Sequence, residues 1–105
     1  DAFHVQGNVY FPSEIEEFLV NSMGVNTNFI IAEQRNKNDQ CSYVIVTENK
    51  DFNSDYLEDI NNFLAKSTFK NLSVSDFVYY EKIPITNNGK YQRSKLKESL
   101  NDLPK

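Results

Sequence analysis

The stretch ITNNGKYQRSKL, residues 85–96, contains the side chains best suited to chemistry in this sequence. Residues 87–89, Asn-Asn-Gly, tolerate positive φ, so the chain can turn sharply just before Lys90. Arg93 follows three positions after the lysine. A lysine is a compact positive charge on a flexible stem. Two interpretations follow: Lys90 serves a site formed by another body of protein, or it is a solvated residue in an ordinary turn.

Few other residues of the sequence could carry catalysis. His4, the one histidine, falls in a predicted hairpin and is interpreted as a surface residue. Cys41 begins an apolar run and is predicted to be a small core residue rather than a reactive thiol. Glu16 and Glu17 are interpreted as the cap and solvated face of a helix, since acidic residues are favoured near a helix N-terminus. The spacings of common metal sites and of a phosphate-binding glycine loop do not occur in the sequence, so no metal site is predicted.

Length and composition predict one soluble globular domain. The chain has 105 residues, 39% of them hydrophobic. Its net charge of -4 argues against a nucleic-acid partner, because phosphate binding needs a basic face. No apolar run approaches the roughly 20 residues that cross a bilayer, so no membrane span is expected. A single cysteine fits a reducing compartment, and a cytoplasmic location is expected.

The first third of the chain alternates between extended and helical patterns. Residues 2–11 predict a β-hairpin with Gly7 and Asn8 at its turn. A helix is expected from Pro12 to a stop at Gly24, with Ser13 and Glu16 at capping-box spacing.

The remaining elements predict a small sheet with packed helices. Residues 28–34 and 41–48 read as a second hairpin, and residues 52–67 as the clearest helix, capped by Asn53 or Ser54. One face of that helix is expected to be apolar and to consist of Tyr56, Leu57, Ile60, Phe63 and Leu64. Residues 74–83 are extended, and residues 93–103 predict a short final helix. The fold class expected is α+β, with an N-terminal hairpin, a small sheet and about three helices.

The segment IPITNNGKYQRSKL, residues 83–96, is similar to the final motif of the adenylate-forming enzymes. This superfamily includes acyl-CoA synthetases, fatty acyl-AMP ligases, adenylation domains of peptide synthetases, and luciferases. The residues that match in register are Ile83, Pro84, Thr86, Asn88, Gly89, Lys90, Arg93 and Leu96. Tyr91 departs from the pattern, because an aliphatic residue is usual there.

A second segment, VQGNVYFPSEIEEFL, resembles the stretch that follows the hinge in the same superfamily. The matching residues are Gly7, Pro12, Glu14, Ile15 and Glu16. The two motifs lie near opposite ends of the sequence, so the resemblance covers nearly the whole chain. It implies that residues 1–105 form a C-terminal lid domain, with Asp1 at the hinge or one residue past it.

The resemblance implies a role for several residues. Lys90 would be the mobile catalytic lysine, which the lid delivers to the reacting carboxylate and α-phosphate. Thr86, Asn88 and Gly89 would shape its loop, and Arg93 would support the loop through backbone carbonyls in preference to pairing with an acid of the large domain. ATP and Mg²⁺ would be bound mostly by a large N-terminal domain, and the isolated lid would be inactive. The hairpin with Gly7 and Asn8 would face the thiol acceptor.

The branch of the superfamily is predicted from the segment VQGNVYFPSEIEEFL. Thiolating acyl-CoA synthetases often carry a basic residue where this chain has Val9, and cations recognise the phosphates of CoA. Phe11, an aromatic residue before Pro12, resembles the fatty acyl-AMP ligases, although Asn8 and Val9 depart from their pattern. A fatty acid and an acyl carrier protein are therefore the favoured substrate and acceptor. An acyl-CoA synthetase, an amino-acid adenylation domain and a free-standing interaction module remain alternatives, and an independent small enzyme is disfavoured for want of catalytic groups.

Overall fold

The structure, a computed structural model, describes residues 2–24, 29–35, 38, 40–51 and 54–85. Its elements in chain order are β1 (Phe3–Val5), β2 (Asn8–Tyr10), α1 (Pro12–Met23), β3 (Phe29–Arg35), β4 (Cys41–Thr47), α2 (Ser54–Ala65) and β5 (Val74–Tyr79). The predicted α+β class and the order of these seven elements are confirmed. The predicted helix over residues 93–103 lies outside the described residues.

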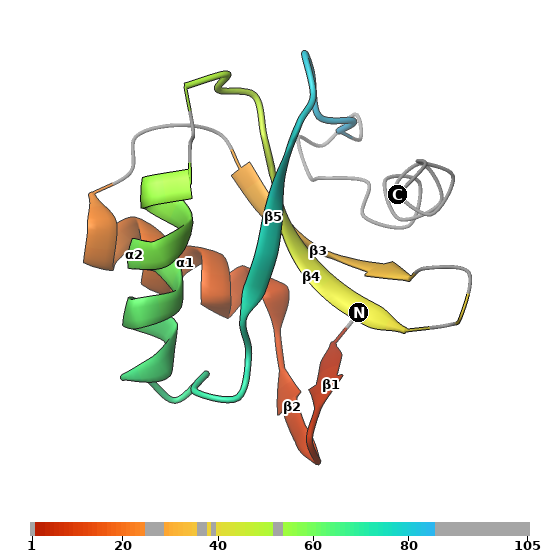
Figure 1. Ribbon diagram of the computed structural model, residues 1–105, viewed down its shortest axis with the longest axis vertical. Coiled ribbons are helices and arrows are strands. Elements are labelled where there is room, and N and C mark those ends of the chain that lie inside the picture. Colours follow the sequence, from red (N-terminus) through yellow and green to blue (C-terminus); the bar gives the residue numbers. More distant parts are fainter. Residues whose placement is uncertain (1, 25–28, 36–37, 39, 52–53, 86–105) are drawn as a thin grey trace.

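Three strands form the main sheet in the order β3-β4-β5. β3 and β4 are antiparallel with a continuous register from Phe29 opposite Thr47 to Arg35 opposite Cys41. β5 runs parallel to β4, and the register shifts once, between Tyr43 and Val44. A parallel pair needs a crossover, which α2 provides. α1 and α2 cover one face of this sheet, and the β1–β2 hairpin lies at one end of it (Figure 1).

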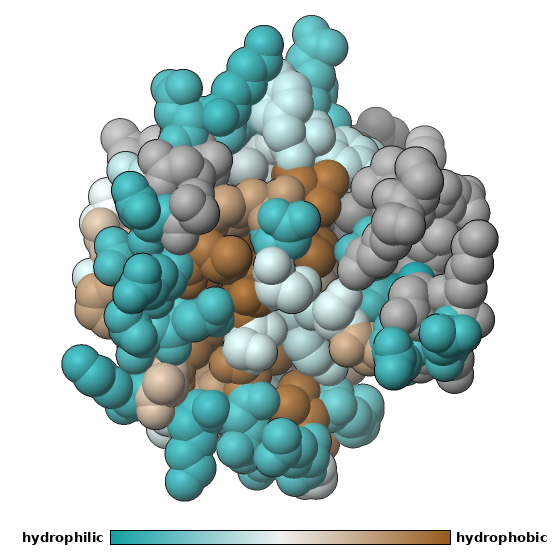
Figure 2. Space-filling model, in the orientation of Figure 1, coloured by the Kyte–Doolittle hydropathy of each residue, from teal (hydrophilic) through white to brown (hydrophobic). Residues whose placement is uncertain are grey.

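Strand alternation sends side chains to both faces of the sheet, and each face has its own buried cluster. The helix-side cluster is formed by Phe3, Val5, Tyr10, Ile15, Leu19, Phe29, Ile31, Ile45, Ile60, Leu64, Phe69, Leu72 and Val74. The second cluster consists of Ile30, Ala32, Val44, Val46 and Ile83. Figure 2, in the orientation of Figure 1, shows hydrophobic residues through the middle of the visible face, flanked by hydrophilic ones. The first residue of the lysine motif, Ile83, therefore belongs to the core.

The start of α1 differs from the prediction. Pro12 stands in the first turn after an extended Phe11, and no side chain of the described residues caps this end of the helix. The predicted capping box of Ser13 and Glu16 is therefore wrong, because Pro12 already fixes a helical φ at the first position. Glu16 is half-buried, and its Oε2 accepts a hydrogen bond of 2.8 Å from the backbone N–H of Ile31 in β3. Its interpretation as a solvated or capping residue is corrected, whereas Glu17 is exposed.

The end of α1 and the apolar face of α2 test two further expectations. Gly24 adopts the left-handed conformation, with φ of 64°, and its N–H bonds to the carbonyl of Val20, as the predicted helix stop requires. Ile60 and Leu64 of α2 are buried as predicted. Tyr56 and Phe63 are exposed instead, because they flank the stripe that meets the sheet. The position before Ser54, where the predicted cap residue Asn53 stands, lies outside the described residues.

A side-chain clamp aligns the start of β5. The Asn61 side chain donates to the carbonyl of Val74 at 2.9 Å and accepts from its N–H at 2.7 Å. α2 thereby fixes where β5 begins, and β5 in turn carries the chain towards Ile83. No helix within the described ranges is long and apolar enough to cross a membrane.

Candidate functional site

The N-terminal hairpin turns through two residues with positive φ. Gln6 has φ of 50° and Gly7 has φ of 81°, which is the combination that a tight two-residue hairpin turn requires. Asn8 begins β2, and its side-chain amide donates to the carbonyl of Gln6 at 3.5 Å. The predicted hairpin is confirmed, but its turn is centred one residue earlier than Gly7–Asn8.

One face of the hairpin is packed against the domain. Phe3 and Tyr10 are buried, with ring centroids 4.8 Å from Tyr43 and 5.4 Å from Phe69. These aromatic contacts fix the hairpin relative to β4 and to the segment after α2.

The other face of the hairpin is open to solvent. His4 and Asn8 are exposed, Val9 is 52% exposed, and Phe11 just after β2 is 50% exposed. Residues 2–11 contain no Lys or Arg. The outward face therefore places Val9 among exposed polar side chains without a Lys or Arg of the hairpin, and the exposure of His4 confirms its predicted surface position.

The root of the lysine loop is held by both backbone and side chain. After β5 ends, the N–H of Tyr80 bonds to the carbonyl of Thr47 at 2.9 Å. Ile83 is 1% exposed, and its N–H donates to Oε2 of Glu48 at 2.8 Å. Pro84 is half-buried and Ile85 is 46% exposed, so the chain leaves the core between these two residues.

The hairpin and the described start of the lysine motif, residues 83–85, lie in different parts of the domain. The hairpin lies at one end of the domain, and β5 carries the chain towards the other end (Figure 1). Lys90, with Thr86, Asn88, Gly89 and Arg93, lies outside the described residues, as does Asp1, so their roles stay predictions. The structure shows how the segment before the lysine is anchored.

Sequence reasoning missed Glu16 and Glu48. Each accepts a bond from a backbone N–H far along the chain, at 15 positions for Glu16 and 35 for Glu48. Neither spacing corresponds to a local motif. The one sequence signal for Glu48 was its position directly after an apolar strand. In the structure Glu48 is half-buried there.

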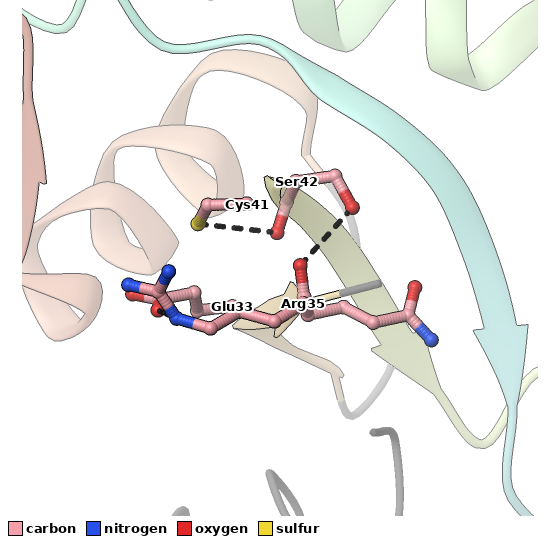
Figure 3. A network of polar contacts seen from close by, with 5 residues as sticks. Glu33, Arg35, Cys41 and Ser42 are labelled. Atoms are coloured by element: carbon pink, nitrogen blue, oxygen red, sulfur yellow. Dashed lines mark hydrogen bonds and ion pairs between the residues drawn. The ribbon is translucent and has the colours of Figure 1, made fainter. Parts of the chain in front are cut away.

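The prediction that Cys41 lies in the core is wrong, because Cys41 is exposed. It is the first residue of β4 and belongs to the network in Figure 3, where its thiol donates to the Ser42 carbonyl at 3.9 Å. In that network Arg35 Nε lies 3.1 Å from Glu33 Oε1, and the Ser42 hydroxyl donates to the Gln34 carbonyl at 3.3 Å.

The surroundings of Cys41 disfavour the thiolate. Burial raises the pKa of the Cys41 thiol, although the residue as a whole is exposed; a hydrogen bond with Tyr43 lowers this pKa and the nearby Glu33 charge raises it. Burial also raises the pKa of Tyr43. Because the thiolate is the nucleophile, this environment works against a reactive cysteine. Within the described part of the chain, no group of three or more His, Cys, Asp or Glu residues could hold a metal ion.

Comparison with known proteins places this fold within larger proteins. The Brucella canis acyl-CoA synthetase matches with a TM-score of 0.73 and 16% identity, over 94% of this chain and 19% of that one. An anthranilate CoA ligase in complex with anthranoyl-AMP matches with a TM-score of 0.67 and 20% identity, over 96% of this chain and 20% of that one. A multidomain structure of a keto acid-selecting peptide-synthetase module, with adenylation and ketoreductase domains, matches with a TM-score of 0.69 and 17% identity. The match covers 94% of this chain and 9% of that one.

These similarities show a shared fold. No family model matches the sequence, and no curated protein matches it. The chain spans about a fifth of the two ligase structures and less of the multidomain one. Nearly all of this chain therefore corresponds to one small part of much larger proteins.

Proposed function

We propose that this chain is the C-terminal domain of an ATP-dependent ligase that activates a carboxylic acid as acyl-AMP. One observation carries the proposal. The Ile-Pro pair that opens the lysine motif, Ile83 and Pro84, is the anchored root of a loop on a fold shared with solved acyl-CoA synthetase and adenylation structures. One of the similar proteins was solved with anthranoyl-AMP, which is an acyl adenylate. The share of those chains that is covered leaves room for a large N-terminal partner domain, joined at or just before Asp1.

The first half-reaction explains the need for Lys90. A carboxylate oxygen of the acid attacks the α-phosphorus of ATP, the bond to the bridging oxygen breaks, and pyrophosphate leaves. An anion is brought onto an anion, so a positive charge placed where negative charge builds lowers the barrier. Lys90 supplies that charge from a loop shaped by Thr86, Asn88 and Gly89, with Arg93 as support. ATP and Mg²⁺ are bound mostly by the large domain.

The second half-reaction uses the other end of the domain. A thiol attacks the acyl carbonyl carbon and loses its proton, AMP leaves, and a thioester forms. The hairpin with Gly7 and Asn8 faces this acceptor. The hairpin and the described root of the lysine loop lie in different parts of the domain, which supports a turn of the domain between the two steps.

We propose a phosphopantetheine thiol of a carrier protein as the acceptor and a fatty acid as the substrate. The uncharged hairpin face supports the choice of acceptor: Val9 is exposed where a cation would meet CoA phosphates. Phe11 before Pro12 supports the fatty acyl branch. Free CoA is the alternative, and it is favoured by the similarity to an acyl-CoA synthetase and to an anthranilate CoA ligase. Rates of transfer from acyl-AMP to a holo carrier protein and to CoA, measured side by side, decide between them.

The proposal is tested by ATP–pyrophosphate exchange in the complete enzyme carrying Lys90→Ala. The expected loss is about 10²- to 10³-fold, the usual effect of removing one transition-state donor. Lys82→Ala, which removes an exposed lysine near the loop root, is the matched control and should stay within about twofold of the parent. Exchange that survives Lys90→Ala at the parent rate would refute the assignment and favour an interaction module with this fold.

A further inference from the structure

We propose that Glu48 is a positioning residue for Lys90: its carboxylate fixes the point from which the lysine loop leaves the core. The inference rests on the proposed function, since it concerns the adenylation step. Glu48 Oε2 accepts a 2.8 Å hydrogen bond from the N–H of Ile83, the residue that opens the motif seven positions before Lys90. The bond joins residues 35 positions apart, so it ties the end of β4 to the end of the segment after β5.

The backbone on both sides of Glu48 is held in place by other contacts. It follows Thr47, the last residue of β4, which is 1% exposed. The Thr47 hydroxyl accepts a hydrogen bond from the N–H of Asn49 at 3.0 Å, and the Asn49 side chain accepts one from the N–H of Asp51 at 2.9 Å. These two turns fix the backbone on the far side of Glu48. A carboxylate between a central strand and a fixed turn is a rigid acceptor.

The Ile83 N–H is the backbone donor directly before Pro84, and Ile85, two residues further on, takes part in an isolated β-bridge. Pro84 has no N–H, and it confines Ile83 to extended conformations. The Ile83 side chain fills the second buried cluster, so the residue is fixed by packing on one side and by Glu48 on the other. Regular pairing between β4 and β5 has already stopped at Thr47 and Tyr79. Beyond the Tyr80 bond to Thr47, the Glu48 bond continues the alignment of this segment with β4.

A fixed root matters because Lys90 must reach atoms that belong to another domain. Misplacement of a catalytic group by about 1 Å can cost on the order of 10²-fold in rate. A root that shifts or rotates would displace the lysine without removing it. Glu48 therefore contributes to the adenylation rate, and it has no part in the thiol transfer assigned to the hairpin at the other end of the domain.

The test compares Glu48 variants with a matched control in the complete enzyme. Glu48→Ala is expected to lower kcat for acyl-AMP formation about 10- to 100-fold, with KM for ATP within about twofold. Glu16→Ala removes an equally short bond, to Ile31, and should leave kcat within about threefold. Transfer of a supplied acyl-AMP to the thiol should be unchanged in both. Equal losses in the two variants, or equal losses in both half-reactions, would show that Glu48 only stabilises the fold.

Two conservative variants guard against misfolding of Glu48→Ala. Glu48→Gln keeps an acceptor oxygen at the same reach and should stay within about threefold of the parent. Glu48→Asp keeps the charge but is one methylene shorter, and should lose about 3- to 10-fold. An Asp variant as active as the Gln variant would overturn the geometric explanation.

A double-mutant cycle separates this inference from the proposed function. If Glu48 acts through Lys90, adding Glu48→Ala to Lys90→Ala lowers exchange by less than about twofold. A full additional loss would mean that Glu48 acts elsewhere and would end the inference. Should Lys90→Ala alone leave exchange intact, the proposed function itself would fail. A large loss in Lys90→Ala with none in Glu48→Ala would remove only the role of Glu48.

Discussion

Glu16 and Glu48 make the same bond in two regions of the molecule. Each accepts a backbone N–H at 2.8 Å, and each is half-buried. They differ in what else holds the bonded segment. Ile31 lies inside β3, which is paired with β4 along its full length, whereas Ile83 lies after the last paired residue of β5. The proposal therefore predicts that the bond is redundant for geometry at Ile31 and important for geometry at Ile83.

The largest effect is expected from the core side chain beside the Glu48 bond. Ile83→Ala should cost about 2–5 kcal/mol of unfolding free energy, because it leaves a cavity in a fully buried cluster. Leu64→Ala, in the helix-side cluster, should cost a similar amount. Urea unfolding measures these two costs. Where both variants are folded, ATP–pyrophosphate exchange should show that only Ile83→Ala slows adenylation. Equal exchange activity in the Ile83→Ala and Leu64→Ala variants would contradict the special role of the Ile83 region.

The two carboxylates should matter about equally for stability. Glu16→Ala and Glu48→Ala each leave a part-buried N–H without this acceptor, at a cost of about 1–3 kcal/mol. Amide hydrogen exchange by NMR distinguishes them locally. The Ile83 amide should lose most of its protection in Glu48→Ala. In Glu16→Ala the Ile31 amide loses this acceptor, while the β3 amides that bond to β4 stay protected. Strong deprotection of β3 in Glu16→Ala would show that its bond is not redundant.

The hairpin offers a smaller effect with an internal control. Gly7 and Gly24 have φ of 81° and 64°, with open space where a Cβ would stand, so alanine at either position meets backbone strain without a clash. Each substitution should cost about 1 kcal/mol in thermal unfolding. Gly7→Ala should also slow thiol transfer at unchanged adenylation, and Gly24→Ala should not. A thiol-transfer rate unaffected by Gly7→Ala would show that the hairpin has no role in the second half-reaction.

The smallest effect lies at the opposite end of β4 from Glu48. Burial raises the pKa of Cys41 and of Tyr43 in the folded state. Above about pH 9 the unfolded chain loses these protons before the folded chain does, so it binds fewer protons and stability falls as pH rises. Cys41→Ser and Tyr43→Phe should each flatten the decline of the urea midpoint between pH 8 and pH 11, by an amount kept small by the exposure of Cys41. An unchanged slope in both variants would contradict this.

The sequence was sufficient for the parts of the fold that depend on local patterns. Apolar runs separated by a polar loop identified β3 and β4, helical spacing identified α1 and α2, and Gly24 marked a helix end. These features follow from backbone geometry and solvent exclusion within a few residues. The motif containing Ile83 and Pro84 was equally visible, and the structure adds that its first residue, Ile83, is buried in the core.

What failed depended on tertiary partners. Cys41 sits in an apolar run but at the exposed end of a strand, and Tyr56 shares the helical spacing of Ile60 but misses the buried stripe. The hydrogen bonds of Glu16 and Glu48 join residues far apart in the sequence. The residues next to each glutamate do not indicate which backbone N–H it accepts from. The parallel neighbour of β4 was likewise set by a crossover rather than by any short pattern.

The most direct measurement is a single-turnover assay of the complete enzyme, which follows acyl-AMP formation and thiol transfer separately in Lys90→Ala and its parent. The account predicts acyl-AMP formation slowed about 10²- to 10³-fold, with ATP binding and transfer from supplied acyl-AMP near parental values. Acyl-AMP formation at the parental rate, or an equal slowing of both half-reactions, would contradict it.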